Sequence, residues 1–178
     1  MHEPPLALLL LGSWVFVRMF KDTMTEKEFF MSTALQEAEI AYSLGETPIG
    51  AVVVKDGKII AKAHNLRETG KNVLYHAELL AIDAACKALG GWRLHQCDLY
   101  VTLEPCVMCS GAISQARIKN LYFGASDNSG GAVLSKSANF NGLFANTNCE
   151  GGILLEECSD ILKRFFKELR SGKINLDK

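Results

Sequence analysis

Apolar residues recur every three or four positions in several segments, a spacing typical of helices with one buried face. Thr25 and Glu28 have the form of a capping box, and the apolar repeat after them predicts a helix from about Thr25 to Leu44. The same spacing predicts three further helices, the last of them amphipathic, at residues 76–89, 106–116 and 158–169.

Short runs between these helices have the pattern of strands. Asp56 and Gly57 separate the runs 51–55 and 58–61, and an Asp-Gly pair supplies the positive backbone angles of a two-residue hairpin turn. Further strands are predicted at 98–103, at 120–124 and, as a short edge strand, at 152–155. Because strands alternate with helices after the hairpin, we expect parallel pairing with right-handed crossovers.

The first 23 residues differ from the rest of the chain. Residues 6–17 form an apolar run that is well short of the ~20 residues needed to span a bilayer, and the start lacks the basic residues of a secretory signal. We expect residues 1–23 to be an extension outside the fold, arising from a mis-assigned start or an unstructured end, with an interfacial anchor as the alternative. Residues 24–178 then form a single domain, and no membrane partner is expected.

The formal net charge of −1 gives no global positive field, so any contact with RNA depends on local patches. One such patch is the lysine- and arginine-rich closing segment, although a solvated helix face explains it equally well. Six cysteines are present, yet a chain of 178 residues needs no disulfides for stability. We therefore predict a reducing, cytoplasmic location, with the four cysteines at 86, 97, 149 and 158 serving as small core residues.

Two motifs carry the candidate chemistry: His76-Ala77-Glu78, and Cys106 and Cys109 in the run Pro-Cys-Val-Met-Cys. Each lies at the expected start of a helix, where the positive end of the helix dipole favours thiolates. Cysteines three apart share one helix face, and a proline is tolerated in a first turn. With His76 as the third ligand, the set leaves one position of a tetrahedral Zn²⁺ open, as in catalytic rather than structural zinc sites.

Glu78 is the candidate proton carrier. Two residues from His76, it lies about 200° around an ideal helix, so the two side chains do not share a face. Side chains of a first turn lean toward the helix start, so Glu78 can reach a water molecule beside the metal without binding the metal itself. This arrangement predicts hydrolytic loss of ammonia from a substrate, with water activated by zinc and protons moved by Glu78.

Each motif also has ordinary explanations. His-x-E occurs by chance, and Cys-x-x-Cys also suits a redox dithiol, half of a structural zinc ribbon or two core thiols. A non-catalytic zinc or dithiol module that binds partners is therefore the rival from another class. An enzyme that deaminates a free base or nucleotide, such as guanine or a cytosine nucleotide, is the rival with the same chemistry. Glu78 favours an enzyme over a binding module, which has no need of a carboxylate beside the metal.

The motifs resemble the signature of the cytidine-deaminase superfamily. The segments Thr47-Pro-Ile-Gly, Ala63-His-Asn-Leu-Arg-Glu, Leu103-Glu-Pro-Cys-Val-Met-Cys and Phe123-Gly-Ala-Ser-Asp are similar to those of bacterial tRNA-specific adenosine deaminases, over roughly residues 25–173. This resemblance implies a three-layer α/β/α fold with a central five-stranded mixed sheet. It also implies a homodimer that converts the wobble adenosine of a tRNA anticodon stem-loop to inosine.

The resemblance also implies four substrate-binding residues. Asn65 would hydrogen-bond the flipped purine, Asp127 would contact the ribose and phosphate, and Phe165 and Phe166 would meet the RNA. Each has a local alternative: Asn65 and Asp127 could cap turns, and either phenylalanine could belong to the core. The chain departs from the resemblance in its apolar extension and in a loop, residues 126–131, that lacks an expected lysine.

Overall fold

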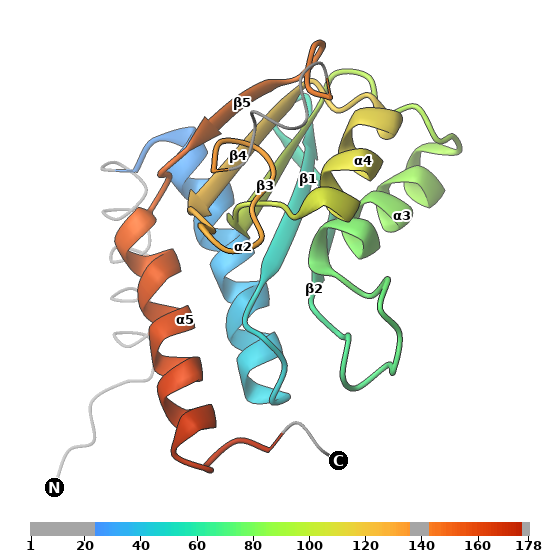
Figure 1. Ribbon diagram of the computed structural model, residues 1–178. Helices are drawn as coiled ribbons and strands as arrows, with labels where there is room; N and C mark the ends of the chain where they lie inside the picture. Colours follow the sequence, from blue (N-terminus) through green and yellow to red (C-terminus); the bar gives the residue numbers. More distant parts are fainter. Residues whose placement is uncertain (1–23, 136–142, 176–178) are drawn as a thin grey trace, which may run out of the picture.

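The computed structural model of the protein describes residues 24–135 and 143–175. Its five strands form one mixed sheet in the order β2-β1-β3-β4-β5, with helices on both faces (Figure 1). In chain order the elements are α2 (Glu26–Ser43), β1 (Gly50–Lys55), β2 (Lys58–His64), α3 (Ala77–Leu89), β3 (Cys97–Leu103), α4 (Val107–Ala116), β4 (Asn120–Ala125), β5 (Asn148–Gly151) and α5 (Leu155–Arg170). This confirms the expected α/β class and the five-stranded mixed sheet.

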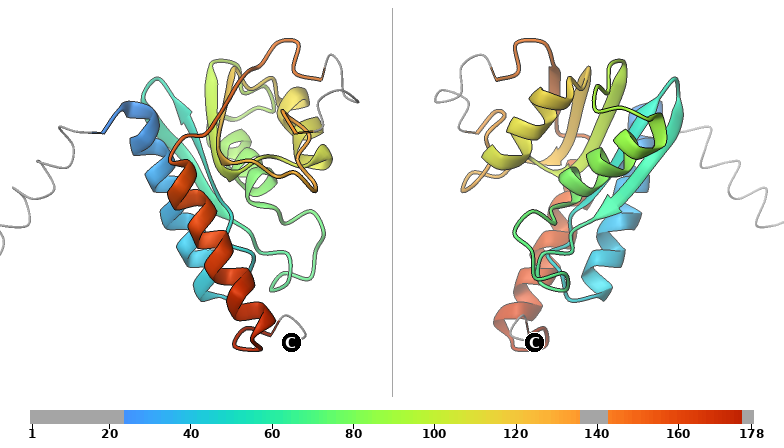
Figure 2. Two further views of the ribbon diagram at one scale, coloured as in Figure 1. Left: turned by 60° about the vertical axis from the view of Figure 1, so that its left-hand side comes forward. Right: turned by 90° about the vertical axis from the view of Figure 1, so that its right-hand side faces the viewer.

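Alternation along the strands produces two cores, one on each face of the sheet. In β1, Ala51 and Val53 pack with the apolar residues of α3 and α4, whereas Val52 and Val54 pack on the side of α2. All four side chains are buried, as expected for a strand with helices on both faces. Figure 2 shows α2 and α5 side by side on one face, and the two helices are in contact.

The local signals at the start of the fold are confirmed. The Thr25 hydroxyl accepts a hydrogen bond from the Glu28 amide at 3.3 Å, and the Glu28 carboxylate accepts one from the Thr25 amide at 2.7 Å. Asp56 and Gly57 have φ values of 51° and 69°, which are the positive angles that the hairpin turn requires. At Gly50 a Cβ would overlap the backbone of α2, so glycine allows this helix to approach β1 closely.

Pairing in the second half of the sheet is parallel, between β3 and β4 and between β4 and β5. The prediction of an edge strand at 152–155 is wrong, because β5 comprises residues 148–151 instead. Gly152 and Leu154 have positive φ values and turn the chain into α5. The apolar side chains of Ile153 and Leu154 pack against the core at that turn. They are therefore hydrophobic because they contact the core, not because they belong to a strand.

The four cysteines outside the candidate metal motif are free thiols. Cys97 and Cys158 are fully buried, and Cys86 and Cys149 pack against the core from half-buried positions. Burial raises the pKa of the Cys149 thiol to about 11 and that of Cys158 to about 12, so both stay protonated at neutral pH. Their predicted role as small core residues is confirmed.

The prediction for residues 1–23 concerns a segment outside the described residues. Within 24–135 and 143–175, every helix is too short or too polar to cross a bilayer.

Candidate active site

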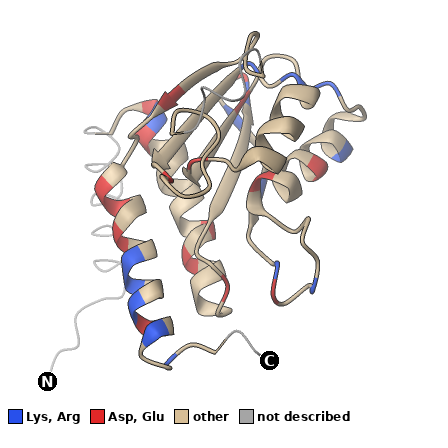
Figure 3. Ribbon diagram, viewed as in Figure 1, with Lys and Arg blue, Asp and Glu red and all other residues tan. Residues whose placement is uncertain are grey.

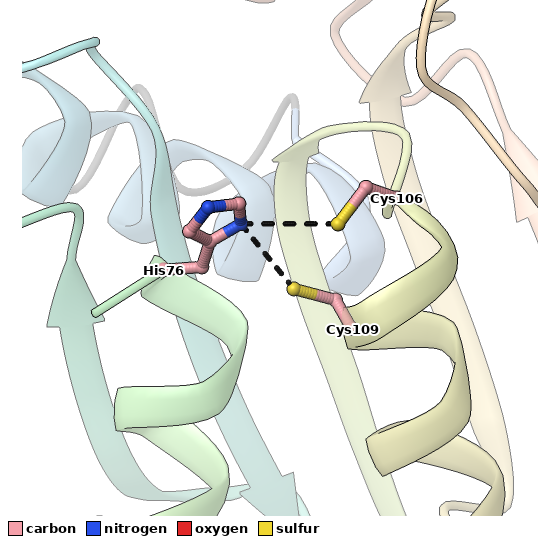
Figure 4. A group of neighbouring side chains, drawn as sticks. All are labelled: His76, Cys106 and Cys109. Carbon is pink, nitrogen blue, oxygen red and sulfur yellow. Dashed lines mark hydrogen bonds between the residues drawn. The ribbon is translucent and has the colours of Figure 1, made fainter. Parts of the chain in front are cut away.

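Three potential ligands meet where α3 and α4 begin. His76 is the residue just before α3, Cys106 is the residue just before α4, and Cys109 lies in the first turn of α4. The loop after β2 leads into α3 and the end of β3 leads into α4, so the two helices bring the three side chains to one edge of the sheet. Figure 4 shows Nδ1 of His76 pointing toward both sulfur atoms.

The spacing of the three ligand atoms fits a tetrahedral zinc ion. Nδ1 of His76 lies 3.8 Å from Sγ of Cys106 and 3.5 Å from Sγ of Cys109, and all three atoms lie within 4.8 Å of one another. Typical Zn–N and Zn–S bonds of ~2.05 and ~2.3 Å at a tetrahedral angle separate nitrogen from sulfur by about 3.6 Å.

The structure corrects the prediction that Cys106 and Cys109 share one face of a helix. Cys106 has extended backbone angles and precedes the helix, so it does not share a helix face with Cys109 in the predicted way. A residue in this position directs its side chain back toward the third residue of the helix, which is Cys109. Pro105 accordingly lies before the cap rather than in the first turn.

His76 occupies the corresponding position before α3, which changes the relation to Glu78. The 200° separation assumed that both residues are helical, but His76 has φ −77° and ψ 147°. Its ring is close enough to the Glu78 carboxylate for each group to shift the pKa of the other. The two side chains therefore lie close together, which the proton-carrier interpretation of Glu78 requires.

The metal-free thiols share protons unequally. A hydrogen bond from the Cys109 thiol, together with His76, lowers the pKa of Cys106 to about 4 against the opposing effect of burial. The Cys109 pKa is raised by its hydrogen bond to Cys106 and by burial, and the His76 pKa is raised mainly by its bond to Cys106. One thiolate is thus already available, and a cation that binds both sulfurs must displace the remaining proton.

Glu78 differs from the other buried carboxylates of the protein. It is 4% exposed, and its Oε2 is the one buried side-chain oxygen or nitrogen among the described residues without a hydrogen-bond partner. Burial raises the pKa of its carboxyl, so the group holds a proton more readily than an exposed glutamate. A buried polar atom without a partner is rare, and here it indicates that Glu78 faces a bound molecule.

Asn65 lies at the start of the loop that ends at His76. Its side-chain amide donates a hydrogen bond to Oε2 of Glu46 at 2.9 Å, and the backbone of Leu66 is hydrogen-bonded to that of Tyr75, next to His76. Asn65 is buried, so it is a fixed part of this loop rather than a mobile surface group.

Glu46 was not recognised in the sequence, although it organises this loop. Its carboxylate is fully buried and also accepts hydrogen bonds from the Glu68 amide at 3.2 Å, the Thr69 amide at 2.6 Å and the Thr69 hydroxyl. A glutamate between Gly45 and Thr47 looks like a solvated turn residue. The available signal was its position a few residues before the apolar run of β1.

Asp127 lies in the loop after β4, in which Gly131 forms a β-bridge with Cys106. Its Oδ1 accepts hydrogen bonds from the Ser129 amide at 2.9 Å and the Gly130 amide at 3.0 Å, which is the turn-capping arrangement named as its alternative role. The Asp127 amide in turn donates to the buried Glu104 at 3.0 Å. Glu104 was also missed, since it lies beside the cysteine motif but not in it.

Phe165 and Phe166 separate into two environments. Phe165 is fully buried and contacts Tyr42 edge to face, whereas Phe166 is 40% exposed. Their rings meet at 5.4 Å, so the buried ring supports the exposed one. Two other histidines lie outside the metal motif: His64 is hydrogen-bonded to Glu37 at 2.9 Å, and His95 is exposed.

Comparisons with known proteins define the class. The family model of MafB19-like deaminases matches residues 25–170, so the fold and the site belong to a deaminase. A tRNA-specific adenosine deaminase of Bacillus subtilis is 49% identical over 155 residues, covering 84% of this chain and 94% of the relative. A tRNA-specific adenosine deaminase of Rickettsia bellii is 45% identical, covering 79% of this chain and 99% of the relative.

A solved structure agrees with these relatives. It comes from a study of A-to-I editing by tRNA:A34 deaminases at the wobble position of transfer RNA. It matches with a TM-score of 0.72 and 46% identity, covering 75% of this chain and 99% of the solved one. The chain belongs to the family of tRNA-specific adenosine deaminases.

Proposed function

We propose that the protein catalyses the zinc-dependent hydrolytic deamination of adenosine to inosine at the wobble position of a tRNA anticodon loop. The observation that carries this proposal is the meeting of three zinc-type ligand atoms within 4.8 Å beside a buried carboxylate oxygen without a partner. The activities named for the relatives at 45–49% identity support the choice of substrate.

His76, Cys106 and Cys109 would hold the zinc ion, because imidazole and thiolate are its usual ligands and their spacing suits a tetrahedron. When bound, the ion supplies Lewis-acid activation of water, whose pKa it lowers toward ~7. Three protein ligands leave room for that water. A structural site, by contrast, is closed by a fourth ligand, and the described residues offer a group of three here.

In this mechanism Glu78 moves the protons. Its Oε2 accepts a proton from the attacking water as the new C–O bond forms at C6 of adenine, and it delivers that proton to the ring nitrogen N1. It then takes the proton of the new C6 hydroxyl and passes it to the departing amino group, as the C6–N bond breaks and the C6–O bond becomes the carbonyl of inosine. Water and adenosine thus yield inosine and ammonia, with Glu78 restored to its starting state.

Substrate contacts follow from the side chains around this centre. Asn65 would hydrogen-bond the purine, because Glu46 fixes its amide in the loop that leads to His76. Asp127 would contact ribose and phosphate through the rigid loop that it caps. Phe166 would offer its exposed ring to the RNA, while Phe165 supports it from the core.

Basic residues of α5 would complete the RNA surface. Figure 3 shows blue segments in the second half of this helix, which carries Lys163, Arg164, Lys167 and Arg170. Such side chains suit phosphates, whose neutralisation supplies much of the affinity of RNA-binding proteins.

Two further parts of the proposal concern assembly and location. A homodimer is supported by the apolar side chains of Val73 and Leu74, which are 68% and 53% exposed next to the site and would be covered by a second copy. A cytoplasmic location is supported by the free thiols, which persist in reducing compartments.

The test offers purified zinc-loaded protein four substrates side by side: an anticodon stem-loop RNA, free adenosine, guanine and cytidine. Ammonia release and inosine formation are measured for each. We expect product from the RNA alone. Turnover of guanine or cytidine with none from RNA would replace this proposal by the free-base or nucleotide alternative, and zinc binding without any turnover would favour a binding module.

A further inference from the structure

A cavity lies far from the metal centre, at the C-terminal ends of α3 and α4. It has a volume of about 880 Å³ and is lined by residues from the loop after α3, the end of α4, the start of β4 and the segment before β5, including Trp92, His95, Arg117, Lys119 and Asn146. We call it the Trp92 cleft. Since α3 has 13 residues at 1.5 Å rise each, the cleft lies roughly 20 Å from His76.

The charges around the Trp92 cleft are unbalanced. None of its described lining residues carries a carboxylate. In the described part of the chain, Arg93, Arg117 and Lys119 have no carboxylate within ion-pair distance, whereas the α5 cations Lys163 and Arg164 are paired with Asp160 and Glu39. Figure 3 shows blue segments in the loops beyond the ends of α3 and α4.

The helix ends do not account for this excess of positive charge. The C-terminus of a helix carries a partial charge of about −0.5, so the ends of α3 and α4 together contribute about −1. Arg93, Arg117 and Lys119 contribute three positive charges at the same place. The remaining surplus of about two favours an anion.

Trp92 adds a flat apolar surface to this charge. Its side chain is 52% exposed, and the guanidinium groups of Arg93 and Arg117 lie over the ring at 4.1 and 5.6 Å from its centroid. Rings and guanidinium planes are the surfaces on which unpaired bases stack. Arg117 and Lys119 line the same cleft as Trp92, so a base stacked on the ring would bring its phosphate toward these cations.

We infer that the Trp92 cleft is a second RNA-binding site, which holds one phosphate and one unstacked base of the RNA substrate at a distance from the reacting adenosine. The inference rests on the proposed function for its ligand and adds an anchoring contact to it. Arg117 and Lys119 hold the phosphate, and Trp92 stacks on the base. The contact strengthens binding of the RNA without taking part in the chemistry.

The test measures the Kd of a labelled anticodon stem-loop RNA by fluorescence anisotropy at several salt concentrations, together with kcat and KM. Trp92→Ala is expected to weaken binding about tenfold, because stacking is worth about 1–3 kcal/mol per base, and Trp92→Phe is expected to restore most of it. Lys119→Gln is expected to lower the slope of log Kd against log salt by about one. The change falls on KM, and kcat at saturating RNA stays as in the wild type.

Lys58→Gln is the matched control, because Lys58 is another exposed lysine, on the β1–β2 hairpin, and it has no ion pair within the described residues. It removes the same charge and is expected to leave Kd and the salt slope unchanged. If Lys119→Gln and Lys58→Gln changed Kd and the salt slope equally, the loss of affinity would come from the general charge of the protein and not from the cleft, which would overturn the inference.

Free AMP and inorganic phosphate are tested as competitors in the same assay. Strong binding of AMP to the wild type, lost in Trp92→Ala while RNA affinity is unchanged, would assign the cleft to a free nucleotide and overturn the inference. Wild-type affinity and turnover of RNA in both Trp92→Ala and Lys119→Gln would also overturn it. A wild-type protein that neither binds nor deaminates RNA would instead refute the proposed function.

Discussion

Glu78 and Glu104 are both buried carboxylates beside the candidate metal centre, yet their surroundings are opposite. Glu104 accepts hydrogen bonds from the amides of Asp127, Val133, Leu134 and Ser135 at 2.7–3.1 Å. Oε2 of Glu78 accepts none from the described residues. The difference separates a carboxylate that builds the site from one that is left available to react.

The two pKa shifts follow the same division. Burial opposes ionisation of Glu104, but the hydrogen bonds from Ser135 and neighbouring amides outweigh it, so its pKa lies below the ordinary value. At Glu78 burial dominates and the pKa is raised. A buried carboxyl that is kept basic can accept and return a proton, whereas Glu104 stays ionised and holds the loop after β4.

The largest expected effect comes from Glu78→Gln, which preserves the shape of the side chain and removes its acid–base function. Deamination of the stem-loop RNA should fall by about 10³-fold, within the range for loss of a general acid–base group. Zinc content and unfolding temperature should stay at or above wild-type values, because an unsatisfied buried carboxylate is removed. Loss of zinc in this variant, measured by mass spectrometry, would show that Glu78 is a ligand instead.

Glu104→Gln should have the converse effect, mainly on stability. The NH₂ group of the glutamine faces backbone N–H groups and cannot accept hydrogen bonds from them. The free energy of unfolding should therefore drop by about 2–3 kcal/mol. Chemical denaturation measures this change. At a temperature where the variant is folded, its activity should fall far less than that of Glu78→Gln, and a comparable loss would break the distinction between the two carboxylates.

The pH dependence of stability should also differ in sign, measured on metal-free protein. Because its pKa is lowered in the folded state, Glu104 adds to the free energy of unfolding. This contribution is complete above the pKa of the unfolded chain, near 4.5, and is lost as pH falls through the folded pKa. The raised pKa of Glu78 means that the folded state binds its proton more tightly, so wild-type stability relative to Glu78→Gln should fall as pH rises above about 4.5. If the stability of the two variants relative to the wild type changed with pH in the same direction, the opposite roles of Glu78 and Glu104 would be contradicted.

The smallest effect is expected from deletion of residues 1–23. The capping box that begins α2 is made by Thr25 and Glu28, both of which the deletion keeps, so we expect the remaining chain to keep the elements around the site. Deamination of the stem-loop RNA should match that of the full chain. A marked loss would assign the extension a role in substrate binding or assembly.

Features encoded locally were predictable from the sequence, including the capping box, the Asp56-Gly57 turn and the metal motifs at two helix starts. His76, Glu78, Cys106 and Cys109 could be proposed from the sequence because their chemistry and their position at the start of a helix are both visible in short segments. Their geometry was less accessible, since His76 and Cys106 precede their helices rather than belong to them.

Features that depend on distant partners were missed. Glu46 and Glu104 are acidic residues next to loops, and only the folded chain shows that amides from segments about 20 to 30 residues away converge on them. The edge strand was misplaced for a related reason. Asn148 and Glu150 are polar because β5 lies at the sheet edge, while the apolar Ile153 packs in a turn.

X-ray absorption spectroscopy at the zinc edge, on protein purified under reducing conditions, tests the site most directly. We predict one zinc per chain with two sulfur ligands, one histidine nitrogen and one further light atom from water, and loss of one sulfur in Cys106→Ala. Four sulfur ligands, or a disulfide between Cys106 and Cys109 without zinc, would contradict it.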